Sequence, residues 1–170
     1  MKFFRIGVAI ALTTLLSSCA GYRTGNVKPA AYASVQKIAV PTFKNSTLEP
    51  RLSVLVTNAV IKQLQTDGTY QIVDVAEADA VLEAEIERIN RSQFRAARDN
   101  QLETRELLST MRVRYSVKDT TTGVLLGAGV AVERSNIVLD PNFQLSDRQV
   151  QADVAAKIAT NITSRISEGW

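Results

Sequence analysis

The N-terminus combines positive charge, an apolar run and a cysteine. Lys2 and Arg5 precede a predominantly apolar run over residues 6–16, and two serines then lead to Cys19. A basic start, a short apolar segment and small residues before a cut site are typical of a secretory signal. The final Leu-Ser-Ser-Cys also resembles the bacterial lipobox, in which diacylglycerol is attached to the thiol, the chain is cut before the cysteine and the new amine is acylated.

The alternatives for this segment are an ordinary secretory signal and a membrane span. The apolar run is shorter than the roughly 20 residues that a spanning helix needs. We therefore predict a signal peptide over residues 1–18, cleavage between Ser18 and Cys19, and a covalent lipid on Cys19 with no other cofactor. Several acyl chains together anchor a protein lastingly. The residue after the cysteine is Ala20. Enterobacterial sorting uses an Asp at this position for inner-membrane retention, so Ala20 favours the outer membrane.

The chain contains a single cysteine and no histidine. With Cys19 acylated, no disulfide can form within the chain. The lack of histidine excludes Ser-His or Cys-His nucleophile pairs and any His-based zinc site, so we predict that the protein is not an enzyme. Its 20 basic and 17 acidic residues include Lys2 and Arg5 of the signal, so the rest is nearly neutral and gives no case for nucleic-acid binding.

Two regions are expected after the signal. Residues 19–34 contain Gly21, Gly25 and Pro29 but few apolar residues, and we interpret them as a lipidated flexible tether. Residues 35–170 are long enough to bury a core of their own, and we predict that they form one domain.

The first half of this domain predicts a strand, a helix and a strand. Residues 35–43 are expected to form a strand whose later part, at Pro41, leaves the ladder or lies at an edge. Residues 45–47 offer N-cap side chains, and an apolar stripe at helical spacing continues to Gly68, which suits a C-cap. The stripe consists of Leu52, Leu55, Val56, Ala59, Val60 and Leu64. Residues 70–75 form the next strand, so a right-handed crossover between parallel strands is expected.

The second half predicts further strands and a long helix. Apolar residues alternate over residues 80–90, and residues 111–118 and 124–132 read as a hairpin with strand character continuing to about residue 139. Gly127 and Gly129 inside the hairpin indicate a bulge or close packing. Ser146 and Gln149 suggest a capping box at the start of the last helix. Its apolar stripe repeats every four residues and consists of Val150, Val154, Ile158, Ile162 and Ile166.

The resulting order is strand, helix, strands, helix. We predict an α+β fold, a two-layer sandwich in which two helices pack on one face of a mixed sheet of four to five strands.

Three glutamates at alternate positions, Glu83, Glu85 and Glu87, share one face of a predicted strand. Such a row could hold a cation or perform acid/base chemistry. The preferred interpretation is that the glutamates pair with Arg112, Arg114 and Lys118 on a neighbouring strand.

Four arginines lie in or near the segment between the alternating strands. Arg91, Arg95, Arg98 and Arg105 form a candidate anion-binding cluster, because the guanidinium fork suits phosphate. The alternative is a solvated hairpin loop whose charge is partly balanced by acidic neighbours.

An ordered set of short segments runs through the chain after the signal: Cys19, Gly21 and Tyr22, residues 38–41, residues 43–45, Thr47, Glu49 and Pro50, residues 78–82, residues 115–123, and Trp170. No single one is specific. Together they resemble the lipopolysaccharide-assembly lipoprotein family (LptE-like), and the resemblance covers nearly all of the chain after the signal.

This resemblance implies a periplasm-facing domain that plugs the lumen of a large outer-membrane β-barrel translocon, aids its assembly and assists lipopolysaccharide insertion. A barrel lumen is polar and lipid A carries phosphates, so the resemblance implies a role for the charged sheet face and for the four arginines as weak contacts to lipopolysaccharide.

A second resemblance is confined to the first half. Residues 37–75 are also similar to the N-terminal region of lipoproteins that serve secretion systems or activate penicillin-binding proteins. The alternative function is therefore that of an outer-membrane accessory to a secretion system or a peptidoglycan synthase. This similarity fades after Leu82, whereas the LptE-like one continues to the C-terminus.

Overall fold

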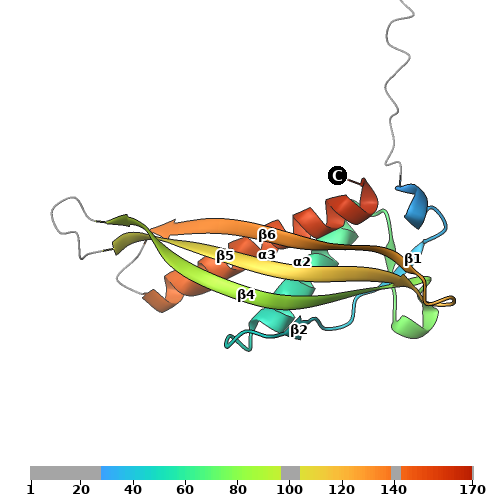
Figure 1. The fold of residues 1–170 in the computed structure, drawn as a ribbon, viewed down its shortest axis with the longest axis horizontal. Helices are drawn as coiled ribbons and strands as arrows, with labels where there is room; N and C mark the ends of the chain where they lie inside the picture. The colour runs from blue at the N-terminus through green and yellow to red at the C-terminus, as the bar shows by residue number, and fades with distance from the viewer. Residues whose placement is uncertain (1–27, 97–103, 139–142, 170) are drawn as a thin grey trace, which may run out of the picture.

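The computed structural model describes residues 28–96, 104–138 and 143–169. Its elements are η2 (Ala30–Tyr32), β1 (Lys37–Ala39), β2 (Lys44–Asn45), α2 (Leu52–Asp67), β3 (Gln71–Ile72), η3 (Val75–Glu77), β4 (Ala80–Ala96), β5 (Thr104–Asp119), β6 (Leu125–Val138) and α3 (Phe143–Ser167). Both long helices cover the same face of the sheet (Figure 1). The predicted α+β sandwich is confirmed, with six strands where four to five were expected.

The sheet is mixed, and only one of its two edges is a single long strand. Its order is β3-β1-β4-β5-β6, and β2 pairs with β4 beyond the end of β1. β1 runs parallel to β3, as predicted for the two strands joined through α2, and also to β4. The three long strands β4, β5 and β6 are antiparallel. One edge is therefore the 14-residue β6, and the other combines the short strands β3 and β2 with residues 87–96 of β4, which have no strand partner on that side within the described residues.

The first predicted strand, over residues 35–43, is broken into β1 and β2. Pro41 has no N–H to donate to a ladder. The backbone of Phe43 is hydrogen-bonded to side chains of α2. The Phe43 N–H donates to Thr57 Oγ1 at 3.0 Å, and the Phe43 carbonyl accepts from Ser53 Oγ at 2.6 Å. The helix thus takes the hydrogen bonds that a continuous strand would need.

The helix ends agree only in part with the predicted caps. Gly68 has φ of 73° and ends α2 as predicted. At the start of α2, Arg51 is the N-cap residue and makes no side-chain cap. The predicted cap residue Asn45 instead closes the preceding turn, donating from Nδ2 to the Glu49 carbonyl at 2.8 Å. Helix α3 already begins at Phe143, so the predicted capping box at Ser146 is wrong.

The helix stripes form the core together with one face of the sheet. Val56, Val60 and Leu64 of α2 are fully buried, and so are Val154, Ile158 and Ile162 of α3. They join one cluster with the inward-facing strand residues Leu82, Ile86, Met111 and Val113. Complete burial of such a side chain stabilises a fold by about 1.5–3 kcal/mol. Both predicted apolar faces are confirmed.

Residues just before β1 pack on the domain. Tyr32 in η2 is only 6% exposed and belongs to the core. Lys28 Nζ donates to the Val35 carbonyl at 2.7 Å and lies 4.6 Å from the centroid of the Tyr70 ring, a cation–π distance. The predicted tether, residues 19–34, therefore overlaps the packed domain at residues 28–34, and residues 19–27 lie outside the described part.

Two glycines on the inward face of β6 make room for tyrosine rings. A Cβ atom on Gly127 would lie 2.1 Å from the Tyr32 hydroxyl, and one on Gly129 would lie 2.7 Å from the Tyr115 hydroxyl. Both distances are far below van der Waals contact. The close packing predicted at these glycines is confirmed.

Replacement of either glycine should therefore overpack this region. We expect Gly127→Ala and Gly129→Ala each to lower the free energy of unfolding by about 1–3 kcal/mol, as other overpacked cores do. Chemical denaturation measures the change. Ala128→Val is the matched control, because Ala128 is exposed and points to the opposite face of the same strand. Glycine variants as stable as the control would show that the tyrosines move aside freely.

Candidate interaction surface

The face of the sheet opposite α2 and α3, called here the open face, carries charged residues from β4 and β5. On β4 the buried Leu82, Ala84 and Ile86 alternate with glutamates. On β5 the buried Val113 and Val117 alternate with basic residues. Because successive strand residues point to opposite sides, both sets of charges meet on the open face.

The glutamates of this face pair with the basic residues of β5. Lys118 Nζ lies 2.7 Å from Glu83. Glu87 accepts from Arg112 Nε at 2.7 Å and from Arg114 Nε at 2.6 Å. The predicted cross-strand pairing is confirmed for these two glutamates. Glu85 instead accepts from the Ser46 hydroxyl at 2.5 Å.

These contacts hold the carboxylates in their charged form. The pKa of Glu87 is lowered from 4.5 by hydrogen bonds from Arg112 and Arg114, and the pKa of Glu83 is lowered by its hydrogen bond from Lys118. Their stabilising effect is thus present above the unfolded pKa and is lost as the pH falls through the lower folded one. A general acid near neutral pH needs a raised pKa, so Glu83 and Glu87 do not suit acid catalysis.

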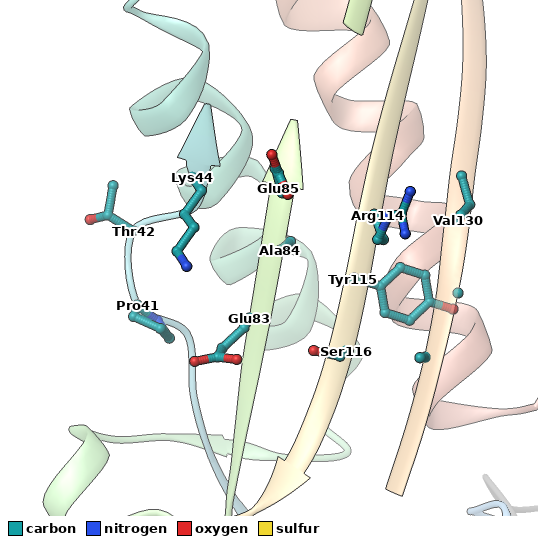
Figure 2. A pocket seen from close by; sticks show the side chains of 12 residues that line it. Pro41, Thr42, Lys44, Glu83, Ala84, Glu85, Arg114, Tyr115, Ser116 and Val130 are labelled. Atoms are coloured by element: carbon teal, nitrogen blue, oxygen red, sulfur yellow. The ribbon is translucent and has the colours of Figure 1, made fainter. Parts of the chain in front are cut away.

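A shallow hollow of about 590 Å³ lies on the open face between the charged rows (Figure 2). Its floor is low because Ser116 and Ala128 are small, and Val130 borders it on β6. Lys44 lies at the opposite rim and forms no ion pair within the described residues. The hollow reaches across the sheet to β6, and its lining mixes apolar and charged groups.

Arg91 does not lie on the open face. The register between β4 and β5 shifts between Ile86 and Arg88, and this bulge reverses which alternate residues point toward the helices. Arg91 therefore points to the helix side. There its guanidinium lies 3.0 Å from Glu49 and 2.7 Å from Asp147 of α3. It bridges the start of both helices to β4, and its charge is compensated.

The other predicted site residues are only partly located. Arg95 lies on β4 and Arg105 on β5, so the predicted loop is in large part strand. The side chains of these two arginines, and all of Arg98, Ser18 and Cys19, lie outside the described part of the chain. The two carboxylate partners of Arg91 were not foreseen, since they stand 42 and 56 residues away in the sequence.

The sequence of this domain matches a known family. The sequence model of the LptE family, described as lipopolysaccharide-assembly, matches residues 35–166. The chain belongs to the LptE family. The match includes every long element described above, which confirms the resemblance found in the sequence. Among curated proteins no sequence matches this chain.

Solved structures share the fold at low sequence identity. A protein from Xanthomonas campestris has a TM-score of 0.60 at 7% identity and covers 82% of this chain and 86% of its own. A putative lipoprotein from Caulobacter crescentus has a TM-score of 0.53 at 15% identity, covering 74% and 88%. A minor lipoprotein from Acinetobacter baumannii has a TM-score of 0.53 at 12% identity, covering 78% and 92%. At these identities the likeness concerns the fold.

Membership of the LptE family makes this chain a lipopolysaccharide-assembly lipoprotein of the outer-membrane type. The family consists of accessory proteins without enzymatic activity, in agreement with the lack of a catalytic constellation in the sequence. Across the described residues, no helix has both the length and the apolar character to cross a membrane.

Proposed function

We propose that this LptE-family protein binds the large β-barrel translocon of the outer membrane, plugs its lumen, and aids both its assembly and the insertion of lipopolysaccharide. The family match over residues 35–166 carries this proposal. The open face supports it, because the charged rows of β4 and β5 make its surface polar, which suits the polar interior of a large barrel. The lipid on Cys19 would keep the domain at the periplasmic side of the same membrane.

Isolation of native complexes tests the partner. A tag on the C-terminus of the lipidated protein should co-purify one large barrel protein from mildly solubilised outer membranes. An untagged strain and a tagged, unrelated lipoprotein serve as controls. Recovery of a peptidoglycan synthase or a secretion complex in place of the barrel would contradict the proposal and favour the alternative function.

The arginines near the tip of the β4–β5 hairpin are the proposed contacts to lipopolysaccharide. Guanidinium groups bind phosphate through charge-assisted hydrogen bonds, each contributing about 1.5–3 kcal/mol at best. Arg95, Arg98 and Arg105 are the main candidates. Arg91 also belongs to the cluster, but its ion pairs with Glu49 and Asp147 leave it less free to bind phosphate.

Replacement of all four arginines with Gln should weaken lipopolysaccharide binding about tenfold or more at low salt, because charge-assisted contacts and long-range attraction are lost. The difference from wild type should shrink at high salt, which screens that long-range attraction. Binding to immobilised lipopolysaccharide, measured at two salt concentrations, gives the change. Arg91→Gln alone is the internal control and should have a much smaller effect. Unchanged binding in the fourfold variant would place the contact elsewhere, with Arg112, Arg114 and Lys118 the next candidates.

A further inference from the structure

The two edges of the sheet are built differently. On one side the edge strands β2 and β3 have only two residues each, a common way to prevent pairing with other chains, and residues 87–96 of β4 have no strand partner on that side within the described part of the chain. On the other side β6 runs for 14 residues as a continuous rim of the sheet (Figure 1). A long exposed edge is a ready template for an additional strand.

β6 also lacks some of the features that usually block such pairing. It contains neither proline nor lysine, and its pairing with β5 is regular from Gly127 onward. Val132 is 41% exposed and Leu125 is 56% exposed. One basic side chain from another element does reach this edge, since Lys157 Nζ donates to the Arg134 carbonyl at 3.2 Å. Lys157 also pairs with Asp153 at 3.0 Å, so a strand that docks here must replace its bond to the Arg134 carbonyl.

The side chains of β6 indicate what kind of strand would fit. Glu133 and Ser135 point toward the helices, where they bond with Asn161 and Asp153 of α3. Val130, Val132 and Arg134 therefore point to the open face. Arg134 is exposed, and its guanidinium forms no ion pair within the described residues. An added strand with apolar residues opposite the valines and an acidic residue opposite Arg134 would complement this row.

We propose that the free edge of β6 docks an extended strand of a protein partner, with an acidic side chain opposite Arg134. That this partner is the barrel protein rests on the function proposed above, whereas the docking of a strand at β6 does not. A second copy of this chain fits less well. In an antiparallel pair of β6 strands, open-face residues would meet open-face residues, and between residues 128 and 136 none of these is acidic. Arg134 would then lack a counter-charge.

Site-specific photo-crosslinking in intact cells tests the pairing. A photoreactive amino acid is placed at Val130, Val132 or Arg134 of the full-length lipoprotein, and at Leu48, which is 101% exposed in a distant loop, as the control. The expected result is a ladder of crosslinks. When the photoreactive residue moves by two positions along β6, the crosslinked residue in the partner should also move by two positions, as in paired strands. The Leu48 position should not show this progression.

Charge reversal tests the role of Arg134. Arg134→Glu should lower the crosslink yield from Val132 about fivefold or more, because attraction to an opposing carboxylate becomes repulsion. Arg51→Glu, on an exposed arginine at the start of α2, is the matched control and should leave the yield unchanged. Equal yields for both variants would overturn the acidic character of the partner strand.

The outcomes separate this inference from the proposed function. A ladder of crosslinks to the barrel protein supports both the docking of a strand at β6 and the proposed function. A ladder of crosslinks to another protein supports docking at β6 but contradicts the barrel as the partner. Recovery of the barrel with the C-terminal tag but no ladder from β6 overturns the edge proposal alone. Adducts of twice the mass of the chain would show that a second copy occupies the edge, and would likewise overturn it.

Discussion

Ile158→Asp should destabilise the domain by about 4 kcal/mol or more, because it places an unpaired charge in a fully buried site and removes a large apolar side chain. Ile158 has no exposed surface and lies in the core between α3 and the sheet. Val60→Asp should act similarly from α2, where Val60 is also fully buried. In a thermal melt this corresponds to a loss of about 10 °C or more for a chain of this size.

A matched control lies on the same helix as Val60. Val54 of α2 is 58% exposed, so Val54→Asp makes the same chemical change outside the core. We expect its melting temperature to stay within about 2 °C of wild type, as for most surface substitutions. Similar melting temperatures for Val54→Asp and Val60→Asp would mean that the assigned inner face of α2 is wrong.

Cys19→Ala should abolish acylation completely. Cys19 is the only thiol of the chain, and the preceding residues have the order of a lipoprotein signal. Without the thiol, diacylglycerol cannot be attached, so the variant should remain an unprocessed precursor or be lost from the outer membrane. Metabolic labelling with a radioactive fatty acid, followed by purification through a C-terminal tag, measures the incorporated lipid.

Ser17→Ala serves as the control for this experiment, because it changes a neighbouring residue but keeps a small side chain before the cut site. It should label like wild type and migrate as the processed form. Label on Cys19→Ala equal to that on Ser17→Ala would rule out Cys19 as the lipid attachment site.

The local patterns predicted the layers of the fold because they have clear periods. The stripe containing Val60 and the one containing Ile158 repeat every three or four residues, and both are buried. The alternation around Leu82 has a period of two and forms β4. Such periods follow from backbone geometry alone, so they survive in nearly any tertiary context.

The partners of Arg91 could not be predicted from a local pattern. The bulge after Ile86 moves the arginine from the open face to the helix side, within reach of Glu49 and Asp147. A signal was present, since Ile86 and Ile89 are three residues apart and break the alternation. Their spacing indicated an irregularity, but it did not reveal which distant carboxylates the arginine would meet.

The sequence by itself was enough to predict the lipid anchor, the order of the main elements and the two helix stripes, because each depends on residues close together in the chain. It also indicated the family, through short segments that occur in order along the whole chain. Only the tertiary structure decided that β6 is a long free edge and that the strands on the opposite side, β2 and β3, are short. Edge position depends on which strands find partners, and α2 takes the backbone hydrogen bonds of Phe43 that would have lengthened the other edge. Long-range competition for hydrogen bonds of this kind leaves no local period to detect.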